Sequence, residues 1–76
     1  MEIKYFGKIA EVIGHMSEQI VLDNLTVSEL KKELFEKYVF LKTETIQVAV
    51  NLNIVEDDFV INQNDEVAIL PPFSGG

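Results

Sequence analysis

Apolar and polar residues alternate at the start of the chain with the period of a β-strand. Every second residue from Met1 to Tyr5 is apolar and would face a core, which leaves Phe6 on the opposite face. Residues 8–13 then carry apolar side chains at helical spacing, and Gly14 follows where a helix would end. With an extended segment at 18–22, the pattern predicts a strand, a short helix and a second strand.

The main predicted helix begins at a capping box. The Thr26 hydroxyl and the Glu29 carboxylate can each accept a hydrogen bond from a backbone N–H that the first helical turn leaves without a partner. Apolar residues recur after this point at intervals of three and four, so the helix is predicted to run to about Lys37 with one buried stripe. On its exposed side we expect Glu33 and Lys37, four residues apart, to form an ion pair.

Two further strands are predicted in the second half of the chain. Residues 46–50 alternate with β-branched side chains on one face, and the turn residues 51–53 follow them. After a weaker extended segment, residues 66–70 form the last strand. Pro71-Pro72 must end this strand, because proline has no N–H to donate to a strand ladder.

These elements predict an α+β fold in which one main helix packs across a mixed sheet, with the first and last strands at its centre. A chain of 76 residues allows one small domain. We expect this domain to span residues 1–70, followed by a Pro-Pro-Phe-Ser-Gly-Gly tail at residues 71–76.

Composition narrows the range of partners. Thirteen acidic and six basic residues give a formal net charge of −7, which repels nucleic-acid phosphates and favours a protein with a basic face. The sequence has no run of about eighteen apolar residues and no signal-peptide pattern, so no membrane span is predicted. The charge and the missing apolar run lead us to expect a protein that binds neither nucleic acid nor membranes. The chain also lacks cysteine, and we therefore expect it in the cytoplasm.

No side-chain cluster predicts a metal site, a bound cofactor or a catalytic centre. Asp57 and Asp58 are neighbours that would point to opposite sides, with no third ligand, and are expected in a solvated loop. His15 is the only histidine and is expected in a surface turn. By elimination, the best chemical group is the α-carboxylate of Gly76.

The sequence ends in Gly75-Gly76, which together make up half of its four glycines. Because glycine lacks a Cβ, such an end can enter a narrow channel in another protein. A carboxylate is inert at neutral pH, so its use requires activation, most simply adenylation with ATP in a partner enzyme. Displacement of the adenylate by a sulfur donor would then give a thiocarboxylate on the main chain of Gly76.

Residues just before the diglycine are expected to anchor the tail, because ordering it costs about 1–2 kcal/mol per residue. The stiff Pro71-Pro72 pair and Phe73 are the natural anchors. Phe73 either folds back onto its own domain or joins Phe6, which faces away from the predicted core, in a docking patch.

Three segments resemble the small subunits of molybdopterin synthase, the MoaD-type sulfur carriers of the ubiquitin-like β-grasp fold. They are residues 65–76 (Asp-Glu-Val-Ala-Ile-Leu-Pro-Pro-Phe-Ser-Gly-Gly), 5–11 and 49–51, and the resemblance covers the whole chain. The chain departs from the family pattern at Ala10, where arginine is usual, and at Asn64, where glycine is usual.

The resemblance implies a reaction cycle. A ubiquitin-activating-enzyme-like adenylyltransferase would use ATP to adenylate Gly76, and a sulfur donor protein would supply the sulfur of the thiocarboxylate. The tail would then enter the synthase large subunit, where the sulfur passes to cyclic pyranopterin monophosphate in molybdenum cofactor biosynthesis. The implied assembly is a heterotetramer whose catalytic side chains lie on the large subunit. The partner-binding residues of this chain would be Phe6, Pro71, Pro72, Phe73, Ser74 and Gly75.

Three alternatives remain open at the level of sequence. A thiamine-pathway sulfur carrier would use the same fold and diglycine. A ubiquitin-like modifier would join Gly76 to lysines of target proteins. A plain interaction module would keep its function without Gly75 and Gly76.

Overall fold

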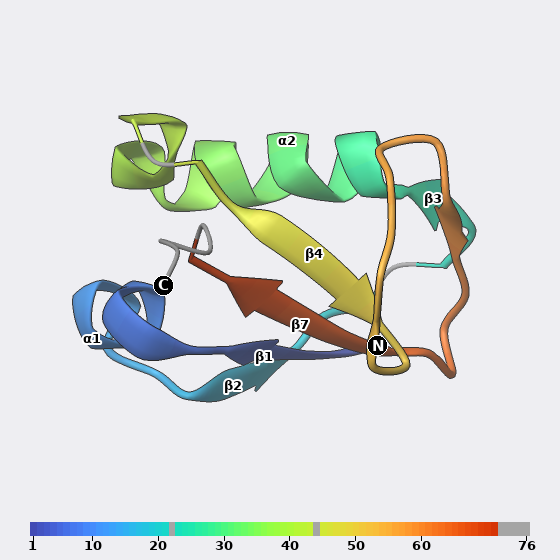
Figure 1. The fold of residues 1–76 in the computed structure, drawn as a ribbon, viewed down its shortest axis with the longest axis horizontal. Coiled ribbons are helices and arrows are strands. Elements are labelled where there is room, and N and C mark those ends of the chain that lie inside the picture. The colour runs from blue at the N-terminus through green and yellow to red at the C-terminus, as the bar shows by residue number, and fades with distance from the viewer. Residues whose placement is uncertain (22, 44, 72–76) are drawn as a thin grey trace.

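The computed structural model describes residues 1–21, 23–43 and 45–71. Figure 1 shows short strands and helices gathered into one body. In chain order the elements are β1 (Glu2–Tyr5), α1 (Gly7–Ile13), β2 (Ser17–Gln19), β3 (Leu25–Thr26), α2 (Val27–Lys37), the 3-10 helix η1 (Val39–Thr43), β4 (Gln47–Val50), β5 (Asn53–Ile54), β6 (Val60–Ile61) and β7 (Glu66–Leu70).

Five of the strands form one mixed sheet in the order β2-β1-β7-β4-β5. The last strand, β7, lies in the middle, parallel to β1 on one side and antiparallel to β4 on the other. β3 and β6 form a separate antiparallel pair. The predicted mixed sheet, with the first and last strands at its centre, is therefore confirmed.

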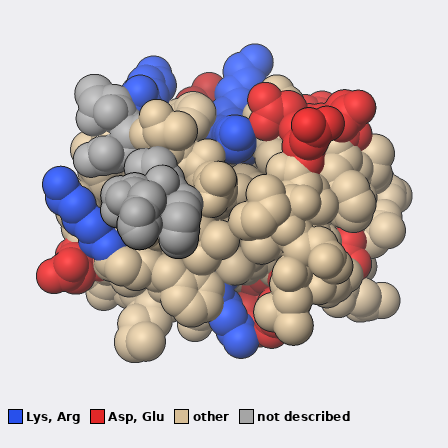
Figure 2. Space-filling model, in the orientation of Figure 1, with Lys and Arg blue, Asp and Glu red and all other residues tan. Residues whose placement is uncertain are grey.

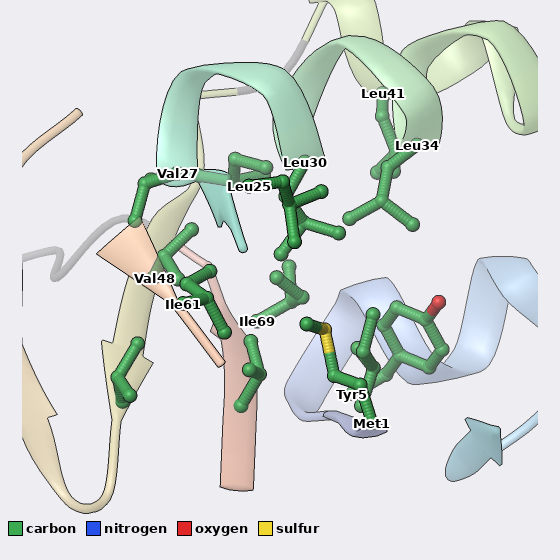
Figure 3. Close-up of a cluster of buried hydrophobic side chains, with 14 of the residues drawn as sticks. Met1, Tyr5, Leu25, Val27, Leu30, Leu34, Leu41, Val48, Ile61 and Ile69 are labelled. Carbon is green, nitrogen blue, oxygen red and sulfur yellow. The ribbon is translucent and has the colours of Figure 1, made fainter. Parts of the chain in front are cut away.

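α2 covers one face of this sheet (Figure 1). Its stripe of Val27, Leu30 and Leu34 is at most 1 % exposed. Figure 3 shows Leu30 and Leu34 directed from the helix towards Ile69 of β7 and Tyr5 of β1. Each such buried side chain contributes roughly 1.5–3 kcal/mol relative to an exposed one, so helix and sheet hold each other in place.

The capping box forms as predicted. The Glu29 N–H donates to Thr26 Oγ1 at 3.1 Å, and the Thr26 N–H donates to Glu29 Oε1 at 2.8 Å. The helix then ends at Lys37, also as predicted. The expected ion pair with Glu33 is wrong, because the Lys37 ammonium instead binds Glu18 of β2 at 2.9 Å.

Some boundaries differ from the prediction, and three short elements were not predicted at all. The strand expected at 18–22 ends at Gln19, and Val21 is 95 % exposed. β3, β6 and η1 have two, two and five residues, too few to show a periodic pattern in the sequence. In the described part of the chain no helix has the length and apolar character needed to cross a membrane.

Candidate functional site

The end of β7 holds the start of the tail in a fixed position. Val67 and Ile69 are fully buried, and Leu70 is the last strand residue before Pro71. Leu70 and Pro71, here called the tail root, lie at the end of the molecule that also holds α1 and η1 (Figure 1). Because β7 is paired on both sides, the tail root cannot shift without breaking the centre of the sheet.

Gly7 approaches the tail root closely from the start of α1. Its φ of +61° is in the left-handed region, and a Cβ at this position would lie 3.3 Å from Pro71 Cγ. A side chain would therefore meet both backbone strain and a tight contact. Pro71 itself is half-buried, and it is the only predicted tail residue within the described part of the chain.

The face of the five-stranded sheet opposite α2, here called the open face, carries a row of small and apolar side chains. Register pairs Lys4 with Ala68, Ala68 with Ala49, and Ala49 with Ile54, so these side chains lie on the same side. Ile54 at the end of the row is 58 % exposed. Ala49 in the middle of the row is only 6 % exposed, so the apolar surface that a partner could reach is offered by Ala68 and Ile54 on either side of it, and the row is here called the strip.

Phe6 extends this surface next to the tail root. Its backbone N–H donates to the Ile69 carbonyl at 3.2 Å, which keeps it beside β7. Its ring is 45 % exposed, so the prediction that Phe6 faces away from the core is confirmed. At the strip's border, Lys4 Nζ lies 3.0 Å from a Glu66 carboxylate oxygen, whose hydrogen bond and charge raise the pKa of Lys4.

A polar network holds the start of β7. The Asn51 side chain accepts from the Glu66 N–H and donates to Asp65 Oδ1, both at 3.0 Å. Asp65 Oδ2 accepts from the Asn62 N–H at 2.8 Å. The hydrogen bonds from Asn62 and then Asn51 lower the pKa of Asp65. The sequence placed these residues in two separate turns, and only the pairing of β4 with β7 brings them together.

Glu18 joins β2 to the end of α2. Its side chain is 14 % exposed, and it accepts hydrogen bonds from Lys37 Nζ at 2.9 Å and from the Tyr38 hydroxyl at 2.7 Å. Burial raises the pKa of the Glu18 carboxyl, but these hydrogen bonds together outweigh it, and the net pKa is lowered. This group ties the helix to the edge of the sheet.

Tyr5 lies next to this cluster. Its ring meets that of Tyr38 edge to face at 6.3 Å, and its buried hydroxyl has no hydrogen-bond partner among the described residues. Burial, followed by the nearby negative charge of Glu18, raises the pKa of Tyr5 above the range of a free tyrosine. The charge of Glu18 therefore raises the pKa of the Tyr5 hydroxyl although the two groups form no hydrogen bond of normal geometry.

The other candidates named from the sequence show no reactive arrangement. His15 is exposed, and Asp57 forms an ion pair with Lys31 at 2.8 Å. Within residues 1–21, 23–43 and 45–71, no three acidic or histidine side chains come together as a metal site would require. The predicted positions Pro72, Phe73, Ser74, Gly75 and Gly76 lie outside the described residues.

Known proteins match this chain over nearly its full length. The ThiS family matches residues 3–76. The molybdopterin synthase sulfur carrier subunit of Dictyostelium discoideum is 38 % identical, over 99 % of this chain and 94 % of that protein. This agrees with the resemblance seen in residues 65–76, which is thereby confirmed.

Solved structures agree on the fold. A Pyrococcus furiosus protein described as molybdopterin converting factor subunit 1 is 25 % identical with a TM-score of 0.85, over 95 % of each chain. Small archaeal modifier protein 1 of Haloferax volcanii is also 25 % identical, with a TM-score of 0.80 over 96 % of this chain and 97 % of that one. The predicted β-grasp fold is confirmed. By sequence match and fold alike, the chain belongs to the ThiS family.

Proposed function

We propose that this chain is a sulfur carrier and the small subunit of molybdopterin synthase. The observation that carries the proposal is the position of β7, the central strand, whose end leads through Pro71 into the diglycine sequence. A central strand before the tail fixes where the tail starts, and the five residues beyond Pro71 limit the distance from Pro71 to Gly76 to at most about 18 Å. The name of the Dictyostelium discoideum relative, a sulfur carrier subunit, supports this assignment.

The proposed chemistry takes place at one carboxylate. Attack of the Gly76 carboxylate on ATP in an adenylyltransferase gives an acyl-adenylate and pyrophosphate. The terminal sulfur of a donor persulfide then displaces AMP, and a second thiol cleaves the acyl disulfide. This cleavage releases the thiocarboxylate and leaves a disulfide behind. In the large subunit the sulfur passes to cyclic pyranopterin monophosphate, and hydrolysis returns Gly76 to a carboxylate.

In this proposal the chain carries sulfur and does not catalyse its transfer. The polar side chains that line the hollow containing Pro71 are Lys8 and Thr45, whereas the open face offers an apolar surface for a protein. We assign Phe6, Leu70 and the row from Ala68 to Ile54 to the contact with the large subunit. Stable subunit contacts are rich in such apolar area.

A ubiquitin-like modifier is the second candidate, and the likeness to small archaeal modifier protein 1 favours it. Both functions begin with adenylation of Gly76. A modifier then transfers the acyl group of Gly76 to another protein, whereas a sulfur carrier transfers only a sulfur atom. A modifier forms an isopeptide bond with a lysine, which leaves the chain attached to its target. A sulfur carrier is released as a free chain with no covalent bond to another protein.

Reconstitution tests the proposal. The chain is incubated with ATP, the adenylyltransferase and a persulfide donor, and then with the large subunit and cyclic pyranopterin monophosphate. We expect the dithiolene product to form, with two carriers consumed for each product molecule. A chain lacking Gly75 and Gly76 serves as the control and should give no product.

Two results would contradict the proposal. Product formation by the control chain would show that the diglycine is not the sulfur donor. Covalent adducts between the chain and lysines of other proteins, without dithiolene product, would support the modifier instead.

A further inference from the structure

A small groove lies beside the tail root, between α1 and η1. Ile9 and Val12 of α1 and Phe40 and Leu41 of η1 line it, and Pro71 forms part of its wall. Ile9 and Leu41 are buried, whereas Val12 is 50 % exposed. The groove therefore has an apolar floor and is accessible from the surface.

The size of the groove matches one aromatic ring. Its volume is about 190 Å³, below the roughly 300–1,000 Å³ of sites that bind small molecules. An apolar cavity of about 150 Å³ is large enough to bind one benzene molecule. The groove therefore has room for the ring of a single phenylalanine side chain.

Charge at this end of the molecule does not favour an occupant of either sign. Lys side chains and Asp or Glu side chains both occur at the left end of Figure 2, where Figure 1 places α1 and η1. Among the described residues that line the groove, Lys8 alone is charged. The property that selects an occupant is therefore the apolar lining.

The chain itself brings an aromatic side chain to this groove. The last described residue is Pro71, in the groove wall, and the sequence continues as Pro-Phe-Ser-Gly-Gly. Two residues span at most about 7 Å, so Phe73 stays close to the groove in every direction that the chain can take. A group on so short a connection meets its site at an effective concentration in the millimolar range. A side chain of a separate protein would have to compete with this concentration.

We propose that the ring of Phe73 occupies the groove in the free chain and makes Phe73 a positioning residue of the tail. The consequence for the reaction rests on the proposed function. With the ring bound, three residues lead from Phe73 to Gly76 and limit their distance to about 11 Å, whereas five residues from Pro71 allow about 18 Å. The adenylyltransferase then orders fewer tail residues when it binds Gly76, which favours binding.

NMR spectra of the isolated chain test whether the ring is bound. We expect Phe73→Ala to shift the methyl resonances of Ile9 and Val12, because these methyl groups lose a neighbouring aromatic ring. Ser74→Ala, the matched control in the tail, should leave them unchanged. In the original chain the amide order parameter of Phe73 should be about 0.8, as in rigid backbone, and that of Gly75 below about 0.6.

A variant of the groove tests the same contact from the other side. Val12→Asp places a charge beside the apolar floor and should lower the Phe73 order parameter below about 0.6. Val39→Asp is the matched control, because Val39 is 63 % exposed and belongs to η1 but does not line the groove. It should leave the order parameter unchanged.

The rate of pyrophosphate release measures the effect on adenylation. We expect V12D and F73A each to raise KM about 10-fold with kcat unchanged, and V39D to stay within about two-fold of the original chain. If both act through the same contact, the double variant V12D/F73A loses no more than either single variant.

Each contrary outcome has a distinct meaning. A Phe73 order parameter below about 0.6 in the original chain, or methyl resonances that F73A does not shift, would overturn the inference while the proposed function stands. Losses of V12D and F73A that multiply in the double variant, or a higher kcat/KM in V12D, would overturn the positioning role. If the original chain releases no pyrophosphate with a competent enzyme, the proposed function falls, and the NMR spectra still decide whether the ring occupies the groove.

Discussion

Gly7 and Pro71 meet where α1 begins and β7 ends. The left-handed φ of Gly7 and the 3.3 Å that would separate a Cβ at this position from Pro71 Cγ are two separate reasons for glycine here. The sequence indicates the first reason, because Gly7 and Gly14 bracket the short helix. It contains no signal for the second, because contact between the two ends of a chain depends on the parallel pairing of β1 with β7.

Replacing Gly7 by alanine should disturb the tail root, and Gly14→Ala is the matched control. Gly14 also has a positive φ of 89°, but a Cβ there meets nothing within 4 Å. We expect each substitution to lower the free energy of unfolding by about 1–2 kcal/mol through backbone strain. Only G7A should also shift the NMR resonances of Leu70 and Pro71. Equal shifts in G14A would contradict the role given to the Gly7 contact.

At the scale of elements, the long and periodic ones were predicted well and the short ones were not. α2 has both a capping box and a buried stripe, and β7 has strict alternation followed by proline. β3 and β6 each have only two residues and exist because they pair with each other. Lys37 binds Glu18 and not Glu33. The Glu18 carboxylate lies between β2 and α2, where the Tyr38 hydroxyl donates a second hydrogen bond to it.

The Glu18 cluster predicts a pH dependence of stability. The pKa of Glu18 is lower in the folded chain than in the unfolded one, so the carboxylate stabilises the fold above its unfolded pKa. This contribution is lost as the pH falls through the folded pKa. At pH 7 we expect Glu18→Gln to lower the free energy of unfolding by about 1–2 kcal/mol.

Denaturant titrations from neutral to acidic pH measure this effect. The difference between Glu18→Gln and the original chain should close below about pH 4. Glu33→Gln, at an exposed position of α2, should change stability by less than about 0.5 kcal/mol. A Glu18→Gln deficit that persists undiminished in acid would be incompatible with a lowered pKa.

At the scale of the whole molecule, β7 links the core to the site. α2 packs on one face of the sheet and leaves the other face open, and the central strand leads from the core to the tail root. The sequence indicated the position of the last strand and the outward face of Phe6. It did not indicate the row from Ala68 to Ile54, because that row depends on register between strands.

The open face can be tested with two phenylalanines of similar exposure. Phe6 is 45 % exposed beside the tail root, whereas Phe59 is 41 % exposed in the loop before β6. We expect Phe6→Ala to weaken binding to the large subunit at least about 10-fold, the effect of losing about 1.4 kcal/mol. Phe59→Ala should leave the affinity within about two-fold. Titration calorimetry with the large subunit measures both, and equal losses would argue against the open face as the contact.

If Gly76 accepts sulfur, the mass of the C-terminal peptide must change. Lys42 is the last basic residue, so a protease that cleaves after lysine releases residues 43–76. Both methionines lie before this peptide, so their oxidation, which also adds about 16 Da, cannot imitate the exchange of oxygen for sulfur. After incubation with ATP, the adenylyltransferase and a persulfide donor, we expect a peptide about 16 Da heavier that reacts with iodoacetamide. An unchanged peptide mass, with an adenylyltransferase and donor that load another carrier in the same experiment, would contradict it.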